Sequence, residues 1–180
     1  MFRVQTFSAD LADDQKTKVA EIDAKLSQKT KKFSENVLDS TNAWDLVIDD
    51  ESRLKGLPEM VKEAARVDAL AQGHGSKDDP KWRFTLQHPS MGPVLQYAED
   101  DDLRRQIWLA SGGVGKEGAF DNSELIWEIL ELRQNKAKVL GCDSFCDLIL
   151  QRRMARNGAT ALSFVEDLHD RIKDQFQQEC

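Results

Sequence analysis

Neither glycine nor proline occurs between Ser8 and Leu54. Within this stretch, apolar residues recur at spacings of three, four and seven, which places them on one face of a helix. Asp, Lys, Glu and Gln occupy the other face, and Ser8 or Asp10 suits the N-cap position. The sequence therefore predicts a helix from about Ser8 to Asn42, roughly 50 Å long at 1.5 Å per residue. Its apolar face consists of Val19, Ile22, Leu26, Phe33, Val37 and Leu38.

A helix of this length cannot be covered by a small globule alone, so it needs either a coiled-coil partner or a large body to lie against. The apolar stripe is interrupted at Lys29, and an interrupted stripe disfavours a sustained heptad coiled coil. The sequence therefore favours packing against other helices, with Val19, Ile22, Leu26, Phe33 and Val37 facing them.

The remaining sequence predicts shorter elements. Residues 44–49 and 82–86 are rich in β-forming side chains and predict two short strands. Pro93 suits the first turn of a short helix through Tyr97, and Gly141 is a C-terminal stop signal. The other expected helices are 58–71, 103–110, broken by Gly112, Gly113, Gly115 and Gly118, then 123–140, 144–155 and 159–176. The predicted fold is mostly α, with a long N-terminal helix, about six shorter helices and two short β-strands.

Composition limits the classes of partner. The chain has 180 residues, which suggests a single domain over 1–180. Its net charge of −7 argues against a nucleic-acid or anionic-membrane partner, because both require a basic patch. We find no apolar run of membrane-spanning length and no signal-peptide pattern. Three cysteines are too few for a disulfide scaffold, so a cytoplasmic location is expected.

The segment Ser111–Glu117 superficially resembles a phosphate-binding loop. Such a loop needs Ser or Thr after its Lys and a strand before it, whereas here Glu117 follows Lys116 and the preceding residues are helical by pattern. A nucleotide-binding switch at this segment is therefore an unfavoured alternative to a flexible connection between helices.

Histidine and cysteine spacing gives no metal or nucleophile motif. No two of His74, His88 and His169 are three or four residues apart, so no zinc-binding helix pattern is present. Cys142 and Cys146 lack nearby additional ligands and are expected to be small buried residues, while Cys180 is expected to be exposed. The sequence therefore predicts no catalytic, cofactor-binding or metal-binding residue in this chain.

Acidic clusters at 49–51 and 99–102 lack the alternating oxygen ligands and glycine of a calcium loop. Each stands where a turn or helix begins. We expect these carboxylates to cap helices and to interact with helix dipoles.

The chain contains an ordered set of short motifs: Lys32–Trp44, Leu54–Glu59, Trp82–Leu86, Pro89-Ser90, Pro93-Val94, Tyr97-Ala98, Leu103-Arg104, Asp121–Ser123, Ile129–Arg133 and Leu140-Gly141. This set resembles the thimet oligopeptidase and oligopeptidase A family of zinc metallopeptidases. The resemblance covers roughly residues 8–170. Departures are local: Met91 stands where the family usually has Tyr, and residues 108–110 and 112–118 differ.

The resemblance implies the function of a region rather than a catalytic site. In such enzymes the helical N-terminal part forms one wall of a channel that admits short peptides. The family's zinc site, His-Glu-x-x-His plus a distant Glu, matches no position here, so zinc is implied only for a longer parent enzyme. The last helix shows no stop signal before Cys180, so we expect a fragment whose partners are the remainder of the parent chain and, through exposed apolar surface, a second copy. The alternative is a non-enzymatic helical protein- or peptide-binding module.

Overall fold

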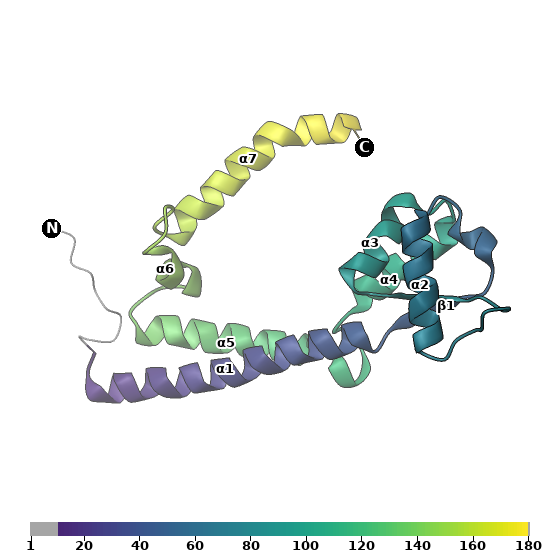
Figure 1. Cartoon of the computed structure of the whole chain (residues 1–180). Coiled ribbons are helices and arrows are strands. Elements are labelled where there is room, and N and C mark those ends of the chain that lie inside the picture. The colour runs from purple at the N-terminus through teal and green to yellow at the C-terminus, as the bar shows by residue number, and fades with distance from the viewer. Residues whose placement is uncertain (1–10, 180) are drawn as a thin grey trace. The chain divides into compact units, whose positions relative to one another are not determined.

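The computed structural model describes residues 11–179. The predicted N-caps Ser8 and Asp10, and Cys180, lie outside these residues. Figure 1 shows a chain of helices with one small sheet. The chain divides into two compact units, which we describe separately: residues 1–30 with 125–180, of which 11–30 and 125–179 are described, and residues 31–124. Among the described residues there are seven α-helices and two short strands, which confirms the mostly α fold.

Helix α1, Asp13–Asn42, is the longest element of the described chain. Val19, Ile22, Leu26, Phe33 and Val37 are all partly buried, so the predicted register is correct. Phe33 is not fully buried, and Leu38, which was placed on the same apolar face, is exposed. Among the described residues, the one fully buried side chain of α1 is the polar Asn36.

The unit formed by residues 31–124 contains the sheet. Strand β1, Asp45–Ile48, pairs antiparallel with β2, Trp82–Thr85, in a register that places Leu46 opposite Phe84. Helix α2, Glu59–Ala71, packs on β2, and α3, His88–Tyr97, and α4, Asp101–Gly113, follow. Short 3₁₀ turns lie at Glu51–Leu54 and Gly118–Phe120. The core is completed by the fully buried side chains Phe84, Leu54, Leu103, Ile107 and Val94.

Two helix boundaries in this unit differ from the prediction. Helix α3 begins at His88, so Pro89 lies in its first turn and Pro93 lies inside the helix. Ser90 and Met91 donate backbone hydrogen bonds to the Gln87 carbonyl, which starts the helix ahead of Pro93. Helix α4 continues through Gly112 and Gly113 because the cost of about 1 kcal/mol per glycine is too small to end a helix by itself.

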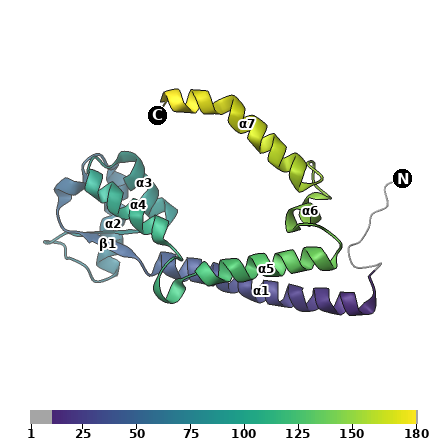
Figure 2. The same ribbon diagram turned by 180° about the vertical axis from the view of Figure 1, so that it is seen from behind.

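The other unit is built from α1 up to Thr30 and from α5, Ser123–Val139, starting at Leu125. It also contains α6, Phe145–Leu150, and α7, Gly158–Glu179. The first half of α1 runs beside α5 in both views (Figure 1 and Figure 2). Lys29 pairs with Glu128 at 2.5 Å, and Lys136 pairs with Asp23 at 2.5 Å. Ala137 is fully buried. Ion pairs and a narrow apolar seam therefore join these two helices.

Helix α6 is shorter than the predicted 144–155. Ser144 caps its start by accepting a hydrogen bond from the Asp147 amide at 3.1 Å. Beyond Leu150 the backbone turns, and Arg156 takes a left-handed conformation with φ of 66°. Helix α7 follows, and none of its described residues is buried against the described chain.

Candidate functional site

A first groove, of about 400 Å³, lies between α2, β2 and the start of α3. Met60, Val61, Phe84 and Pro89 give it an apolar lining. Arg83 is the cation of the groove.

Two carboxylates neutralise this cation. Nε of Arg83 bonds Asp45 at 2.6 Å, and its Nη1 bonds Asp68 at 2.6 Å. The hydrogen bond that Arg83 donates to Asp45 is the largest cause of its raised pKa; burial opposes this rise, and the bond to Asp68 adds to it. Since its charge is neutralised, this groove is suited to an apolar group.

A second groove, of about 490 Å³, lies in the same unit and includes Trp44, Leu86, Leu109 and Phe120. Glu117 also lines this groove and forms no ion pair within the described residues. The aromatic side chains could stack on an apolar or planar group, and the carboxylate would repel an anion.

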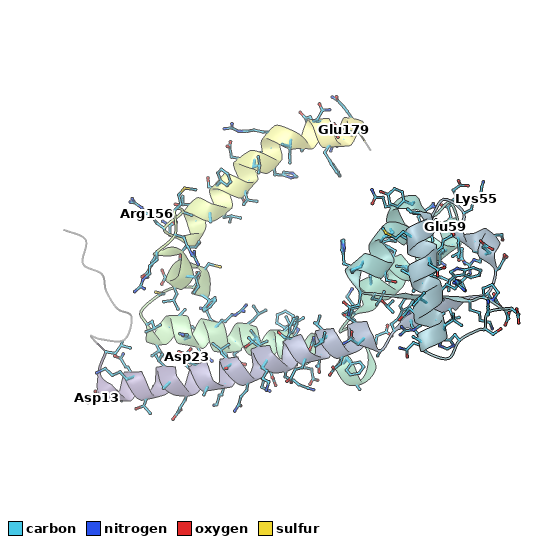
Figure 3. The ribbon with its side chains drawn as sticks, in the orientation of Figure 1. Asp13, Asp23, Lys55, Glu59, Arg156 and Glu179 are labelled. Atoms are coloured by element: carbon cyan, nitrogen blue, oxygen red, sulfur yellow. The ribbon has the colours of Figure 1, made fainter. Side chains whose placement is uncertain are left out.

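The third groove, of about 460 Å³, belongs to the other unit. Leu26 of α1, Leu140 and the α6 residues Phe145, Leu148 and Ile149 line it. Its cationic side chains are Lys136, Arg152 and Arg153. Figure 3 marks Asp23 on α1 beside α5, and this carboxylate holds Lys136.

Sequence reasoning missed the basic character of this third groove. Residues 133–156 carry six basic and two acidic side chains, although the whole chain has a net charge of −7. Counting charge in a sliding window would have found this reversal of sign. The six are Arg133, Lys136, Lys138, Arg152, Arg153 and Arg156, and the two acidic residues are Asp143 and Asp147.

The acidic clusters act as predicted. Asp50 accepts a hydrogen bond from the Ser52 amide at 2.9 Å. Asp100 caps α4 by accepting from the amides of Asp102 and Leu103 at 2.9 and 3.0 Å. The Arg53 guanidinium donates to Asp100 at 2.7 Å, and this bond, followed by that from Leu103, lowers the pKa of the Asp100 carboxyl. The structure thus gives these two carboxylates a capping function.

The phosphate-loop-like segment has the wrong local structure for nucleotide binding. Ser111, Gly112 and Gly113 are the last residues of α4, so a helix precedes the loop instead of a strand. The Gly115 amide donates to Ser40 Oγ at 3.1 Å, and its carbonyl accepts from the Asn122 amide at 2.9 Å. The loop is therefore hydrogen-bonded to α1 rather than free, which corrects the expectation of a flexible connection.

The three histidines are placed separately. His74 is partly buried in the turn after α2, His88 is the exposed first residue of α3, and His169 is exposed on α7. The expected burial of the cysteines is wrong, because Cys146 is exposed and Cys142 only partly buried. Within residues 11–179 no group of three or more His, Cys, Asp or Glu side chains could hold a metal ion. No helix among the same residues is long and apolar enough to cross a membrane.

Comparison with known proteins identifies the family that the chain resembles. Residues 94–180 match the sequence profile of peptidase family M3. Oligopeptidase A of Haemophilus influenzae is 37% identical over 174 residues, which cover 94% of this chain and 25% of that protein. Oligopeptidase A of Escherichia coli is 32% identical over the same shares. The chain resembles an N-terminal region of peptidase family M3.

This similarity confirms the family resemblance predicted from the short motifs. It extends to saccharolysin of Saccharomyces cerevisiae, which is 24% identical over 91% of this chain and 22% of its own length. The chain spans about a quarter of the length of these M3 relatives. Any activity of a whole M3 peptidase is therefore a proposal for this chain.

Proposed function

We propose that this chain is part of the N-terminal channel wall of an oligopeptidase-like zinc metalloendopeptidase that cleaves short peptides, and that it contains no catalytic site of its own. The observation that carries this proposal is the identity of 37% over 94% of the chain to one part of an oligopeptidase A. The region 1–180 is proposed as a single N-terminal region of that longer enzyme.

The exposed surface of α7 supports a place within a larger protein. Six large apolar side chains of this helix are between 46% and 67% exposed. Contiguous apolar surface of this kind marks an interaction site in a soluble protein. The parent chain would cover it. These side chains are Leu162, Phe164, Val165, Leu168, Ile172 and Phe176.

The residues present do not fit a zinc site. Zinc requires three or four nitrogen, sulfur or carboxylate ligands converging on one point. Within residues 11–179 such a group is absent, and His74, His88 and His169 come from separate segments. We therefore assign the zinc of the parent enzyme to residues outside this chain.

The described residues contribute grooves on the protein surface. The two grooves of the sheet-containing unit offer apolar and aromatic linings without an unpaired cation among the described residues. Such linings suit the side chains of an unfolded peptide. A cytoplasmic location of the parent is part of the proposal, since a relative in Arabidopsis thaliana is described as a "probable cytosolic oligopeptidase A".

A chimera tests the proposal. The matching 174-residue region of the H. influenzae oligopeptidase A is replaced by that of this chain, and a deletion of the region serves as control. We expect the chimera to bind zinc and to hydrolyse a quenched-fluorescent peptide. The isolated chain should do neither, and the deletion should not hydrolyse the peptide. A folded, zinc-loaded chimera no more active than the deletion would contradict the proposal.

The alternative, a non-enzymatic helical module that binds a protein or peptide, is favoured by the same exposed face of α7. The chimera separates the two. A module with unrelated function would leave the chimera inactive, whereas a region of an M3 peptidase would support hydrolysis.

A further inference from the structure

We propose that the third groove, which we call the basic groove, binds the C-terminal end of a short peptide. The residues that carry this proposal are Leu26, Lys136, Leu140, Phe145, Leu148 and Arg153. In this arrangement Arg153 holds the terminal carboxylate, and a large apolar last side chain lies against Phe145. The inference rests on the proposed function, because that function makes short peptides the ligands of this chain.

The floor of the groove fits an apolar side chain. Leu148 is buried, and Leu26, Leu140 and Phe145 are partly buried around it. The groove volume of about 460 Å³ lies within the usual range for sites that bind small ligands. The floor is apolar, so a fully hydrated anion such as free phosphate would leave it uncovered.

Two neighbouring cations already have partners. Lys136 pairs with Asp23 at 2.5 Å. The Arg133 guanidinium lies over the Phe145 ring, with 5.4 Å between its carbon and the ring centroid. This cation–π contact holds the Phe145 ring in place. The ring also lines the groove.

Arg153 is different. Within residues 11–179 its side chain forms no ion pair or side-chain hydrogen bond, although it lines the groove. A guanidinium presents a planar set of donors that matches both oxygens of a carboxylate. The surrounding segment, 133–156, carries a net charge of +4 from six basic and two acidic residues. An anionic group is therefore attracted here and repelled by most of the remaining surface.

The test uses the full chain and two fluorescein-labelled tetrapeptides that end in leucine, one with a free carboxylate and one with a C-terminal amide. Binding is followed by fluorescence anisotropy at low ionic strength. We expect the carboxylate form to bind about fivefold more tightly than the amide, which corresponds to the upper end of the range for an exposed ion pair. Added salt should reduce the difference.

Arg153→Gln should reduce the preference for the carboxylate to less than about twofold. Lys138→Gln is the matched control, because Lys138 is exposed and lies about 200° around α5 from Lys136. It should keep the preference. Circular dichroism of both variants checks that helix content is unchanged.

Equal binding of the two peptides to the unsubstituted chain would overturn the inference, and so would a preference that survives Arg153→Gln. Neither result depends on hydrolysis by the chimera. An active chimera with no carboxylate preference would remove the groove from the account and leave the proposed function standing. An inactive chimera together with a clear carboxylate preference would contradict the proposed function and leave the carboxylate site in the groove standing.

Discussion

Asn36 Nδ2 donates a 2.9 Å hydrogen bond to Oδ1 of Asn122, which joins the C-terminal part of α1 to the residue that precedes α5. Both side chains are buried, at 3% and 2% exposure. Asn122 Nδ2 in turn donates to the Phe33 carbonyl at 3.2 Å. Among the described residues Asn36 Oδ1 has no partner. A polar pair, rather than apolar contact alone, therefore fixes the loop at 114–122 on the long helix.

Truncation of Asn36 and truncation of Asn122 should lower the free energy of unfolding by different amounts. Asn122→Ala leaves Asn36 Nδ2 unpaired and removes the additional hydrogen bond to the Phe33 carbonyl, so we expect a loss of about 2–3 kcal/mol in unfolding free energy. Asn36→Ala leaves Asn122 Oδ1 unpaired and removes an acceptor that was already unsatisfied, so about 1–2 kcal/mol is expected. Urea denaturation measures both. Asp39→Ala, an exposed control on α1, should change the free energy by less than about 0.5 kcal/mol.

Asp100 should make stability depend on pH. Because its pKa is lower in the folded protein than the ordinary 3.8, its charge stabilises the fold above that value and ceases to do so as pH falls through the folded pKa. Asp100→Asn keeps an N-cap side chain but removes the charge that faces Arg53. We expect it to cost about 1 kcal/mol at pH 7 and much less at pH 3.

Urea denaturation of the unsubstituted chain and of Asp100→Asn at the two pH values measures this difference. Asp49→Asn, which alters an exposed carboxylate in the same unit, serves as control and should show no such change. A deficit in Asp100→Asn that is the same at both pH values would mean that the ion pair with Arg53 does not stabilise the fold.

Gly56 has both a positive φ, of 89°, and a close neighbour, because a Cβ there would collide with the Tyr97 carbonyl oxygen. Gly73 has a similar φ of 81° but open space around it. Gly73→Ala should therefore cost about 1 kcal/mol for the backbone conformation alone, and Gly56→Ala at least about 2 kcal/mol more for the collision. Comparable melting temperatures for the two variants would show that the Tyr97 segment moves aside easily.

Phe33 is only partly buried, so its contribution should be smaller than full burial would give. Truncation of a fully buried Phe costs about 3–5 kcal/mol, and for Phe33→Ala we expect roughly 2 kcal/mol. Leu38→Ala, at a position that is 55% exposed, should cost under about 1 kcal/mol. Denaturant midpoints of the two variants test the register of α1.

Local signals were sufficient to predict most elements. The helix at Ser123–Val139 has an Asp-Asn-Ser start, a regular apolar face and Gly141 after its end, so pattern and structure agree. The start of helix α3 differs from the prediction. Pro93 suits the first turn of a helix, but α3 begins earlier, at His88.

The grooves depend on tertiary placement. Leu26 and Phe145 are far apart in the sequence, and no periodicity indicates that both line one groove. The burial of Asn36 was also unpredictable, because it depends on Asn122 meeting it from another segment.

The last prediction concerns α7. Val165, Leu168 and Ile172 lie along one face of this helix, and all three are about half exposed in the described chain. A second copy offers the same apolar face, so we expect the chain to form concentration-dependent dimers, as measured by light scattering. Leu168→Lys together with Ile172→Lys should hold the chain as a monomer, because paired faces would then bring together like charges without apolar contact. Asp170→Lys together with Asp174→Lys, on the opposite face of the helix, changes the net charge more than the first pair of substitutions does. This second variant should still form dimers. A monomer at high protein concentration in the unsubstituted chain would mean that this face is covered in another way.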